Sequence, residues 1–343
     1  MRLRLITAVL GIALLATACG DDAPAAPPGS EAEGEGTVTV YSGRDEEFVG
    51  ALFDQFEADT GIALDVRYGD SAELAATILE EGDSSPADVF LSQDAGSLGA
   101  IGAEGLFTEL PSDIIDRVDE RFRSEDGLWV GTSGRGRVAA YNTDKLSDED
   151  LPDSILGFTD PEWKGRIGFP PTNSSFQAFV AAMIELEGED ATRTFLEGLV
   201  ANEPELYEDN GSTVRAIAAG DVEVGFVNHY YIYEVAAEDG EIPVANHFFT
   251  AGDPGALVNS AGAGILATSA NPEGAQTLIE YLTGEEGQTY FSTETWEYPV
   301  VAGYEPSVDL VPLDEIESPD IDLSDLAGTI EPALDLLAEV GLL

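Results

Sequence analysis

The chain is short of basic residues. Lysine and arginine together number 14 against 67 aspartates and glutamates, which gives a formal net charge of −53 over 343 residues. So few cations cannot neutralise a run of phosphates, and nucleic-acid binding is therefore excluded. The excess of acid is typical of a protein that stays soluble in high salt, and a general attraction for cations follows from it without defining a metal site.

The residues of redox and acid–base chemistry are equally scarce. Cys19 is the only cysteine, so no intramolecular disulfide can form and no second thiol is available for catalysis. The two histidines, His229 and His247, are isolated in the sequence and are expected to be structural or surface residues. The chain has no Walker loop, dinucleotide-binding glycine motif, His-Glu-x-x-His motif or nucleophile elbow. Nothing in the sequence argues for turnover, and we expect a protein that is not an enzyme.

The amino terminus has the pattern of a secretion signal. Basic residues at 1–4 precede an apolar run at 5–15, which is too short to span a membrane, and a small triplet then ends in Cys19. This triplet resembles a bacterial lipobox, with Ala16 where leucine is more usual. We expect a signal peptide at 1–19, a lipid on Cys19 and a location on the outer face of the cell membrane. A stray cysteine in an ordinary signal peptide is the alternative. Residues 20–36 hold almost nothing to bury and predict a flexible tether.

The remaining part of the chain alternates strand and helix patterns. Strands are predicted at 37–41, 63–68 and 86–92, with helices beginning at 45 and at 71 between them. Further strands are predicted at 138–141 and 222–227, and helices at 176–186, from 210, at 272–282 and at 330–343. Such alternation indicates βαβ units and a mostly parallel sheet, and therefore an α/β fold. Roughly 300 residues are enough for two lobes with separate cores.

Two adjacent tyrosines, Tyr230 and Tyr231, follow the predicted strand at 222–227. A helix is predicted directly after them, at 233–237, so the phenols lie at the carboxyl end of a strand, where α/β proteins place functional groups. A phenol ionises near neutrality only beside strong positive charge, which a hard trivalent cation such as Fe³⁺ supplies. Packing of the two rings in a core or an interface is the alternative interpretation.

Polar residues in two other places suit an anion. Arg135 and Arg137 are two apart in an extended segment, so their side chains point the same way and suit a carboxylate or other anion. A surface ion pair with local acids is the alternative. The cluster at 172–175 precedes one predicted helix and Asn210 opens another. Polar side chains and free N–H groups at a helix start bind anions, although one of these residues must also cap the helix.

Seven segments resemble, in the same order, the periplasmic ferric-ion-binding proteins, which are the solute receptors of ABC iron importers. The segments are Tyr-Ser-Gly-Arg at 41–44, Ser-Pro-Ala-Asp-Val-Phe at 85–90, Ser-Gly-Arg-Gly-Arg-Val at 133–138, 163–168, 228–231, Asp-Pro-Gly-Ala-Leu-Val at 253–258 and Glu-Tyr-Pro at 297–299. The match covers nearly all of 37–343. It implies a two-lobe periplasmic-binding-protein fold hinged by crossing strands, with the ligand closed between the lobes. Lobe 1 would comprise 37–134 and 262–310, and lobe 2 would comprise 135–261 and 311–343.

The resemblance also implies which residues bind the cargo. Tyr230 and Tyr231 fall on the paired tyrosines that bind Fe(III). The first-lobe ligand positions, where relatives often carry histidine or glutamate, fall on Asp45 or its neighbour Glu46 and on Gln93 or its neighbour Asp94. Residues that fall around a bound phosphate or carbonate, or on the arginine segment that faces the cleft, are Asn173, Ser174, Ser175, Asn210, Asn228, Arg135 and Arg137.

The expected charges of this site balance. Fe³⁺ with two phenolates and the Asp45 carboxylate sums to zero, and the two arginines then compensate an added anion, as a buried site requires. We therefore expect an extracytoplasmic, monomeric receptor that captures Fe(III) with phosphate or carbonate as a synergistic anion and delivers it to the permease of an ABC importer. The alternative is the same fold binding a small organic solute such as thiamine or a phosphonate.

Overall fold

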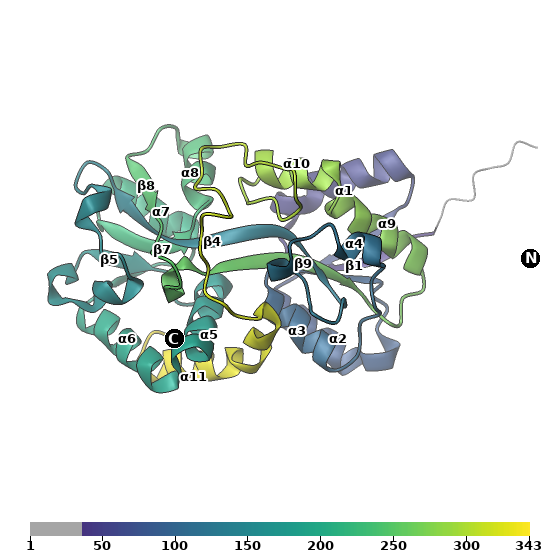
Figure 1. Cartoon of the computed structure of the whole chain (residues 1–343), viewed down its shortest axis with the longest axis horizontal. Coiled ribbons are helices and arrows are strands. Elements are labelled where there is room, and N and C mark those ends of the chain that lie inside the picture. Colours follow the sequence, from purple (N-terminus) through teal and green to yellow (C-terminus); the bar gives the residue numbers. More distant parts are fainter. Residues whose placement is uncertain (1–35) are drawn as a thin grey trace, which may run out of the picture. The chain divides into compact units, whose positions relative to one another are not determined.

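The computed structural model describes residues 36–343 (Figure 1). The expected signal peptide, the lipid-attachment residue Cys19 and the tether up to residue 35 lie outside the described residues. Within 36–343, no helix is both long and apolar enough to cross a membrane.

The first strands form a parallel group. β1 (Val38–Ser42) pairs in parallel with β2 (Leu64–Tyr68) on one side and with β3 (Val89–Ser92) on the other. α1 (Glu46–Thr60) and α2 (Ser71–Glu81) connect these strands, and α3 (Ala95–Ala103) and α4 (Ser112–Ile115) follow them. The carboxyl end of β1 thus leads directly into the start of α1, as the acids at the predicted helix start had indicated.

One long strand joins two groups of strands. β4 (Val130–Asn142) pairs antiparallel with β9 (Val258–Ile265) along its first half, and with β7 (Val224–Asn228) and β8 (Val244–His247) along its second half. β5 (Ile167–Phe169) and β6 (Glu205–Leu206) extend the second group in parallel. Figure 1 shows β4 and β9 side by side between these groups. Both are buried along their whole length.

The early start of β4 was not predicted. The sequence indicated a strand only from residue 138, because the glycines before it lack the side chains that give a strand its alternating pattern. Tertiary packing forms the strand there. A Cβ on Gly131 would lie 2.5 Å from the Ser260 hydroxyl of β9 and 2.8 Å from the carbonyl oxygen of Phe122, so only glycine lets these backbones approach.

The α-helices that follow β5 in the chain lie against both groups of strands, with α7 on β7 and α9 on β9. They are α5 (Ser174–Glu187), α6 (Glu189–Ala201), α7 (Asn210–Ala219), α8 (Tyr231–Asp239), α9 (Pro272–Leu282), α10 (Glu285–Thr293) and α11 (Ile330–Glu339). The 3₁₀ helices are η1 (Gly82–Ser84), η2 (Glu120–Phe122), η3 (Asp148–Asp150), η4 (Ile155–Thr159), η5 (Pro161–Trp163), η6 (Pro254–Ala256) and η7 (Leu323–Gly328). Among the boundaries that differ from prediction, those of α5 and α8 matter for the tyrosines and the polar cluster: each helix begins two residues early, which places Ser174, Ser175 and Tyr231 inside first turns.

The carboxyl-terminal segment returns across the molecule. α11 packs on α5, and η7 packs on α3 (Figure 1). The contact with α3 is so close that a Cβ on Gly99 would lie 2.4 Å from the carbonyl oxygen of Ser324. The same segment therefore contacts helices that follow β3 and helices that follow β5. The boundaries proposed for the two lobes stay a prediction.

Candidate functional site

The tyrosine pair lies where β7 ends and α8 begins. The rings of Tyr230 and Tyr231 stack with their centroids 4.3 Å apart and an angle of 29° between their planes. Tyr230 is 1% exposed, and Tyr231 is partly buried. The ring of Phe48, in the first turns of α1, meets Tyr230 edge-on at 6.2 Å. The fold therefore brings the start of α1 against two phenols that lie about half the chain away from it.

The surroundings keep both phenols neutral. Burial raises the pKa of Tyr230, and the carboxylate of Glu297 raises it further, while Arg135 and Arg44 act in the opposite direction. Burial also raises the pKa of Tyr231 well above its ordinary value, and the neighbouring Tyr230 adds to this. Both groups thus keep their protons at neutral pH unless a strong positive charge arrives beside them.

A buried ion pair adjoins the phenols. Arg44 Nη1 and Nη2 donate to the two carboxylate oxygens of Glu297 at 2.9 and 2.8 Å, and both side chains are buried. The Thr295 hydroxyl also donates to Glu297, at 2.8 Å, and Arg135 Nε lies 4.0 Å from the carboxylate. Two hydrogen-bonding atoms of Arg135, Nε and Nη1, are buried without a partner among the described residues. One carboxylate thus faces two guanidiniums, and positive charge is left over next to the tyrosines.

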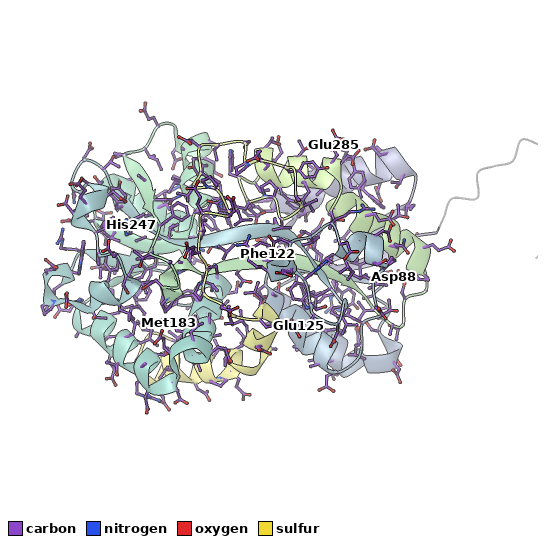
Figure 2. All side chains as sticks on the ribbon, in the orientation of Figure 1. Asp88, Phe122, Glu125, Met183, His247 and Glu285 are labelled. Carbon is purple, nitrogen blue, oxygen red and sulfur yellow. The ribbon has the colours of Figure 1, made fainter. Side chains whose placement is uncertain are left out.

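His229 holds the Glu297 segment in place. Its Nδ1 accepts from the Gly136 N–H at 3.1 Å, so its Nε2 carries the proton and donates to the carbonyl oxygen of Trp296 at 3.0 Å. Burial lowers the pKa of His229 to about 4, so the ring is neutral. Trp296 has a φ of 53°, in the left-handed region that a bulky residue adopts only when its surroundings fix it. His229 is therefore structural, as expected. His247, on β8 (Figure 2), also has a structural setting, between Asp148 Oδ1 at 2.8 Å and the Pro152 carbonyl oxygen at 3.1 Å.

A second polar cluster forms where α5 and α7 begin. Asn173 Oδ1 caps α5 by accepting from the Ser175 N–H at 3.0 Å, and it also accepts from the Ser175 hydroxyl and from Asn210 Nδ2. Arg137 Nη1 lies 3.4 Å from Ser175 Oγ, and its Nη2 donates to the Phe226 carbonyl oxygen at 3.0 Å. Burial lowers the pKa of Arg137 to about 9, which leaves it charged at neutral pH.

The structure brings together most of the residues predicted to bind an anion. Asn173, Ser175, Asn210 and Arg137 share one hydrogen-bonded cluster, and the buried Asn228 lies opposite Arg137 on β7. Ser174 occupies the first turn of α5 beside this cluster. The two arginines differ in their partners: Arg137 faces the helix starts, whereas Arg135 faces Glu297.

The four candidate first-lobe ligands lie in different settings. Asp45 precedes α1, is exposed and makes no capping hydrogen bond, and Glu46 lines a shallow cavity with Tyr68 on the β2 side of α1. The Gln93 N–H donates to Ser71 Oγ at 2.9 Å. Asp94 caps α3 by accepting from the N–H and hydroxyl of Ser97, and burial raises its pKa. Within 36–343, none of these four side chains has a hydrogen bond or ion pair with the tyrosines, and no group of three or more His, Cys, Asp or Glu is placed to hold a metal.

Arg44 and Glu297 were missed as site residues. Both lie in segments that carry the family resemblance, 41–44 and 297–299, but no role was given to either. The pair spans 253 positions of sequence, so no local pattern indicates it. A glutamate beside a tyrosine and a proline offered the only signal, and that signal fits a surface turn equally well.

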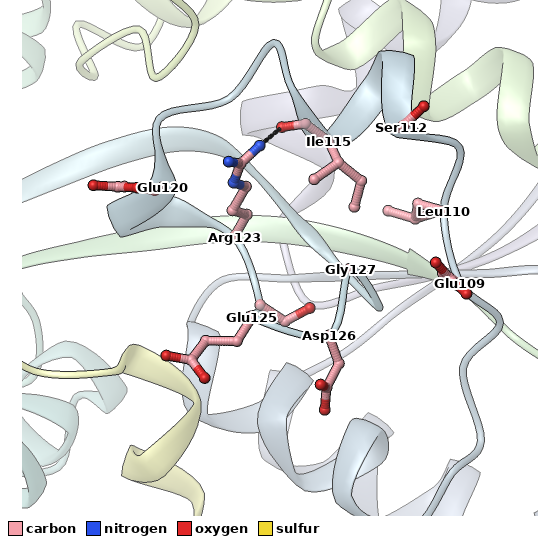
Figure 3. Close-up of a pocket in the computed structure, with 10 residues that line it drawn as sticks. Glu109, Leu110, Ser112, Ile115, Glu120, Arg123, Glu125, Asp126 and Gly127 are labelled. Carbon is pink, nitrogen blue, oxygen red and sulfur yellow. Dashed lines mark hydrogen bonds between the residues drawn. The ribbon is translucent and has the colours of Figure 1, made fainter.

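Several open cavities of the described part are not lined by either tyrosine. One of about 530 Å³ is bordered by acids and by Arg123, which donates to the Ile115 carbonyl oxygen (Figure 3). The lining residues are Glu109, Leu110, Ser112, Ile115, Glu120, Arg123, Ser124, Glu125, Asp126 and Gly127. None of them belongs to the tyrosine cluster. A site that closes around one ion needs little empty volume. The candidate site is therefore identified by its side chains and not by a large cavity.

Sequence comparison places the chain among known proteins. The family model described as bacterial extracellular solute-binding protein matches residues 84–318. The Fe(3+)-binding periplasmic protein of Serratia marcescens is 35% identical over 89% of this chain and 90% of its own length. The major ferric iron-binding protein of Neisseria meningitidis serogroup B is 33% identical over 89% of this chain and 93% of its own length.

Solved structures agree with the sequence comparison. Iron-bound HitA from Pseudomonas aeruginosa has a TM-score of 0.83 and 35% identity, and the match covers 89% of this chain and 99% of that one. A Trichodesmium protein (IdiA, FutA) in complex with iron and citrate ligands has a TM-score of 0.76 and 29% identity, over 90% and 100% of the two chains. These comparisons confirm three predictions made from the sequence: the family resemblance, the two-lobe α/β fold, and a protein that binds a solute and is not an enzyme. The chain belongs to the family of bacterial extracellular solute-binding proteins.

Proposed function

We propose that this chain is the extracytoplasmic receptor of a ferric-iron importer, which captures Fe(III) with a small anion and delivers it to an ABC transporter. The observation that carries the proposal is the stacked pair of the buried Tyr230 and the partly buried Tyr231 beside Arg135. Packing of the two rings does not require their hydroxyl groups. A trivalent cation, in contrast, would convert both phenols into strong oxygen ligands. Relatives at 33–35% identity are named for binding ferric iron, which supports the same cargo.

The surrounding charges support a role for an added anion. Fe³⁺ and two phenolates leave one positive charge, and Arg44 with Glu297 contributes none because the pair cancels. Arg135 and Arg137 then raise the total to three positive charges in a buried site, which is heavily penalised without counter-charge. One exogenous anion and a first-lobe carboxylate would supply most of this negative counter-charge. We propose phosphate or carbonate for the anion, held at the cluster of Arg137, Ser175 and Asn210.

Among the first-lobe candidates, Asp45 is the most suitable ligand for the metal. It directly follows Arg44, whose side chain reaches the tyrosine cluster, and its carboxylate makes no capping bond that would have to break. Asp94 is less suitable because both its oxygens are occupied by Ser97. Glu46 lines the opposite side of α1 with Tyr68, and a neutral amide at Gln93 is a weaker ligand for a hard cation.

The remaining features of the proposal concern the amino terminus and assembly. A lipid on Cys19 would hold the receptor at the outer face of the cell membrane, and a single acyl chain would not suffice for stable anchoring. We propose that the receptor acts as a monomer. Mass spectrometry of membrane fractions tests the lipid, and a Cys19→Ala variant released into the medium is the expected result.

Titration of the metal-free protein with Fe(III) tests the cargo. Binding should produce a visible phenolate-to-iron absorption band, which the double variant Tyr230→Phe/Tyr231→Phe abolishes. Tyr233→Phe is the matched control: Tyr233 lies two residues further along α8, its hydroxyl donates to the Asp309 carbonyl oxygen, and its loss should leave the band unchanged. A colourless wild type, or a full band in the double variant, would refute the proposal.

An organic cargo is the competing function, and no observation favours it. A fructose-6-phosphate-bound protein, AfuA from Actinobacillus pleuropneumoniae, has the same fold, but at 20% identity the likeness concerns the fold alone. Calorimetry of the metal-free protein with thiamine and with a phosphonate separates the two: heat without colour indicates an organic solute.

A further inference from the structure

The hydrogen bonds of the cluster at the starts of α5 and α7 have a fixed direction. Asn173 caps α5, so its Oδ1 must point at the Ser175 N–H, 3.0 Å away. The same oxygen accepts from the Ser175 hydroxyl at 2.6 Å. Asn210 approaches this oxygen from α7 at 3.1 Å and must therefore present its Nδ2 amide group, because two amide oxygens cannot hydrogen-bond to each other. Both ends of the Asn210 amide are thereby assigned.

This orientation leaves an acceptor and a donor unused. The Asn210 side chain is fully buried, and its Oδ1 receives no hydrogen bond within residues 36–343. Arg137 is 3% exposed, and its Nε–H has no acceptor in the same part of the chain. The two side chains meet on one hydroxyl, since Arg137 Nη1 lies 3.4 Å and Asn210 Nδ2 lies 3.3 Å from Ser175 Oγ. A buried neutral acceptor and a buried cationic donor thus belong to two side chains that meet at one hydroxyl.

The unused pair determines what kind of anion fits. A fully deprotonated oxyanion offers hydrogen-bond acceptors only. It can therefore accept from Arg137, but its lone pairs would repel those of Asn210 Oδ1. An oxyanion that carries one hydrogen satisfies both residues, because a charged oxygen accepts from Arg137 and the O–H donates to Asn210. Leaving a buried acceptor without a donor is expensive, and a low-dielectric surrounding increases the cost.

We propose that Asn210 is a specificity-determining residue that selects an oxyanion carrying a hydrogen, such as hydrogen phosphate or hydrogen carbonate. The inference rests on the proposed function, in which this cluster holds the anion that accompanies Fe(III). Asn210 Oδ1 accepts the hydrogen of the anion, Arg137 holds its charge, and Asn173 fixes Asn210 in the required orientation.

Two matched pairs of anions test the inference in the metal-free protein by calorimetry at mildly alkaline pH. Hydrogen phosphate and sulfate are both tetrahedral dianions, and hydrogen carbonate and nitrate are both planar monoanions, so each pair matches in shape and charge and only one member carries a hydrogen on an oxygen. The hydrogen-bearing member should bind about 10- to 100-fold more tightly, the ratio that corresponds to one unpaired buried acceptor. The pair that shows this preference identifies the anion of the site as hydrogen phosphate or as hydrogen carbonate. Equal affinities within both pairs, tighter binding of sulfate or nitrate, or no binding of any of the four overturns the inference.

A variant assigns the preference to the residue. Asn210→Ser replaces a fixed acceptor by a hydroxyl that rotates to donate or accept, so the ratio within each pair should fall towards one. Asn271→Ser is the matched control, because Asn271 caps α9 through the Gly274 N–H, far along the chain, and serine also caps helices. Circular dichroism confirms folding, and where Asn210→Ser does not fold, the wild-type ratio decides.

The ferric band, measured in the same samples, separates this inference from the proposed function. Colour without a preference within either anion pair overturns the role of Asn210 and leaves the ferric proposal standing. A preference without colour overturns the ferric proposal and leaves the selectivity of Asn210 standing.

Discussion

Replacing Glu297 by glutamine tests whether the buried pair with Arg44 organises the tyrosine site. The substitution keeps the size of the side chain but leaves the Arg44 guanidinium buried and opposite a neutral amide. Both residues are buried and joined by two hydrogen bonds, of 2.9 and 2.8 Å. Breaking such a pair from one side costs about 3–5 kcal/mol of unfolding free energy, because the remaining charge stays in a medium that solvates it poorly. For a chain of this size, that corresponds to a fall in melting temperature of roughly 5–8 °C.

An exposed pair in the same protein gives the scale. Lys164 and Glu203 lie 2.9 Å apart, but their side chains are 53% and 72% exposed. Water and salt screen such a pair, so Glu203→Gln should cost less than about 1 kcal/mol. The two glutamate-to-glutamine changes are chemically identical, so their difference compares a buried glutamate hydrogen-bonded to Arg44 with an exposed one paired to a lysine.

The double variant Arg44→Gln/Glu297→Gln completes the experiment. It removes both charges together, so its loss of stability should be smaller, by about 1–3 kcal/mol, than the sum of the losses measured for Arg44→Gln alone and for Glu297→Gln alone. Urea unfolding at neutral pH, followed by circular dichroism, gives the midpoints and slopes for all variants. If Glu297→Gln costs no more than Glu203→Gln, or if the losses of Arg44→Gln and Glu297→Gln simply add, the buried pair does not stabilise the tyrosine site.

Three further predictions follow from the same surroundings. The pKa of His229 is about 4 against about 6.5 when unfolded, so the unfolded chain binds more protons between these values. Stability should therefore fall by about 3 kcal/mol as pH drops through that window, and a His229→Gln variant should lack this slope in urea titrations at successive pH values. Tyr230 and Tyr231 must each release a proton to bind Fe(III), so titration of the visible band should show affinity falling up to about 100-fold per pH unit of acidification, and an unchanged affinity would contradict phenolate ligation. Gly99→Ala would push a methyl group onto the Ser324 carbonyl oxygen and should cost about 1–3 kcal/mol, and an unaffected melting temperature would contradict the close packing of α3 on η7.

Much of the site was predictable because its parts are local in sequence. A strand that ends in two tyrosines, and a small polar cluster before a helix, each indicate a carboxyl-end site without any knowledge of what lies opposite. Tyr230, Ser175 and Asn210 were singled out in this way, and the structure places each at the start of a helix or next to one, while their roles in binding stay a prediction. The separate tasks of Arg135 and Arg137 were not predictable, because alternation along a strand shows that two side chains point the same way but not what each of them meets.

The sequence alone determined the α/β class, the likeness to ferric-ion-binding proteins and the tyrosine pair, since periodicity, order of motifs and adjacent residues are all properties of the linear chain. Only the tertiary structure decided that Glu297 pairs with Arg44, that His229 fixes the segment carrying Glu297, and that Asn210 is left with an unused acceptor. The physical reason is burial. Which charge is cancelled and which hydrogen-bonding atom stays unpaired depends on the groups that surround it in space, and those groups come from segments up to 253 residues apart.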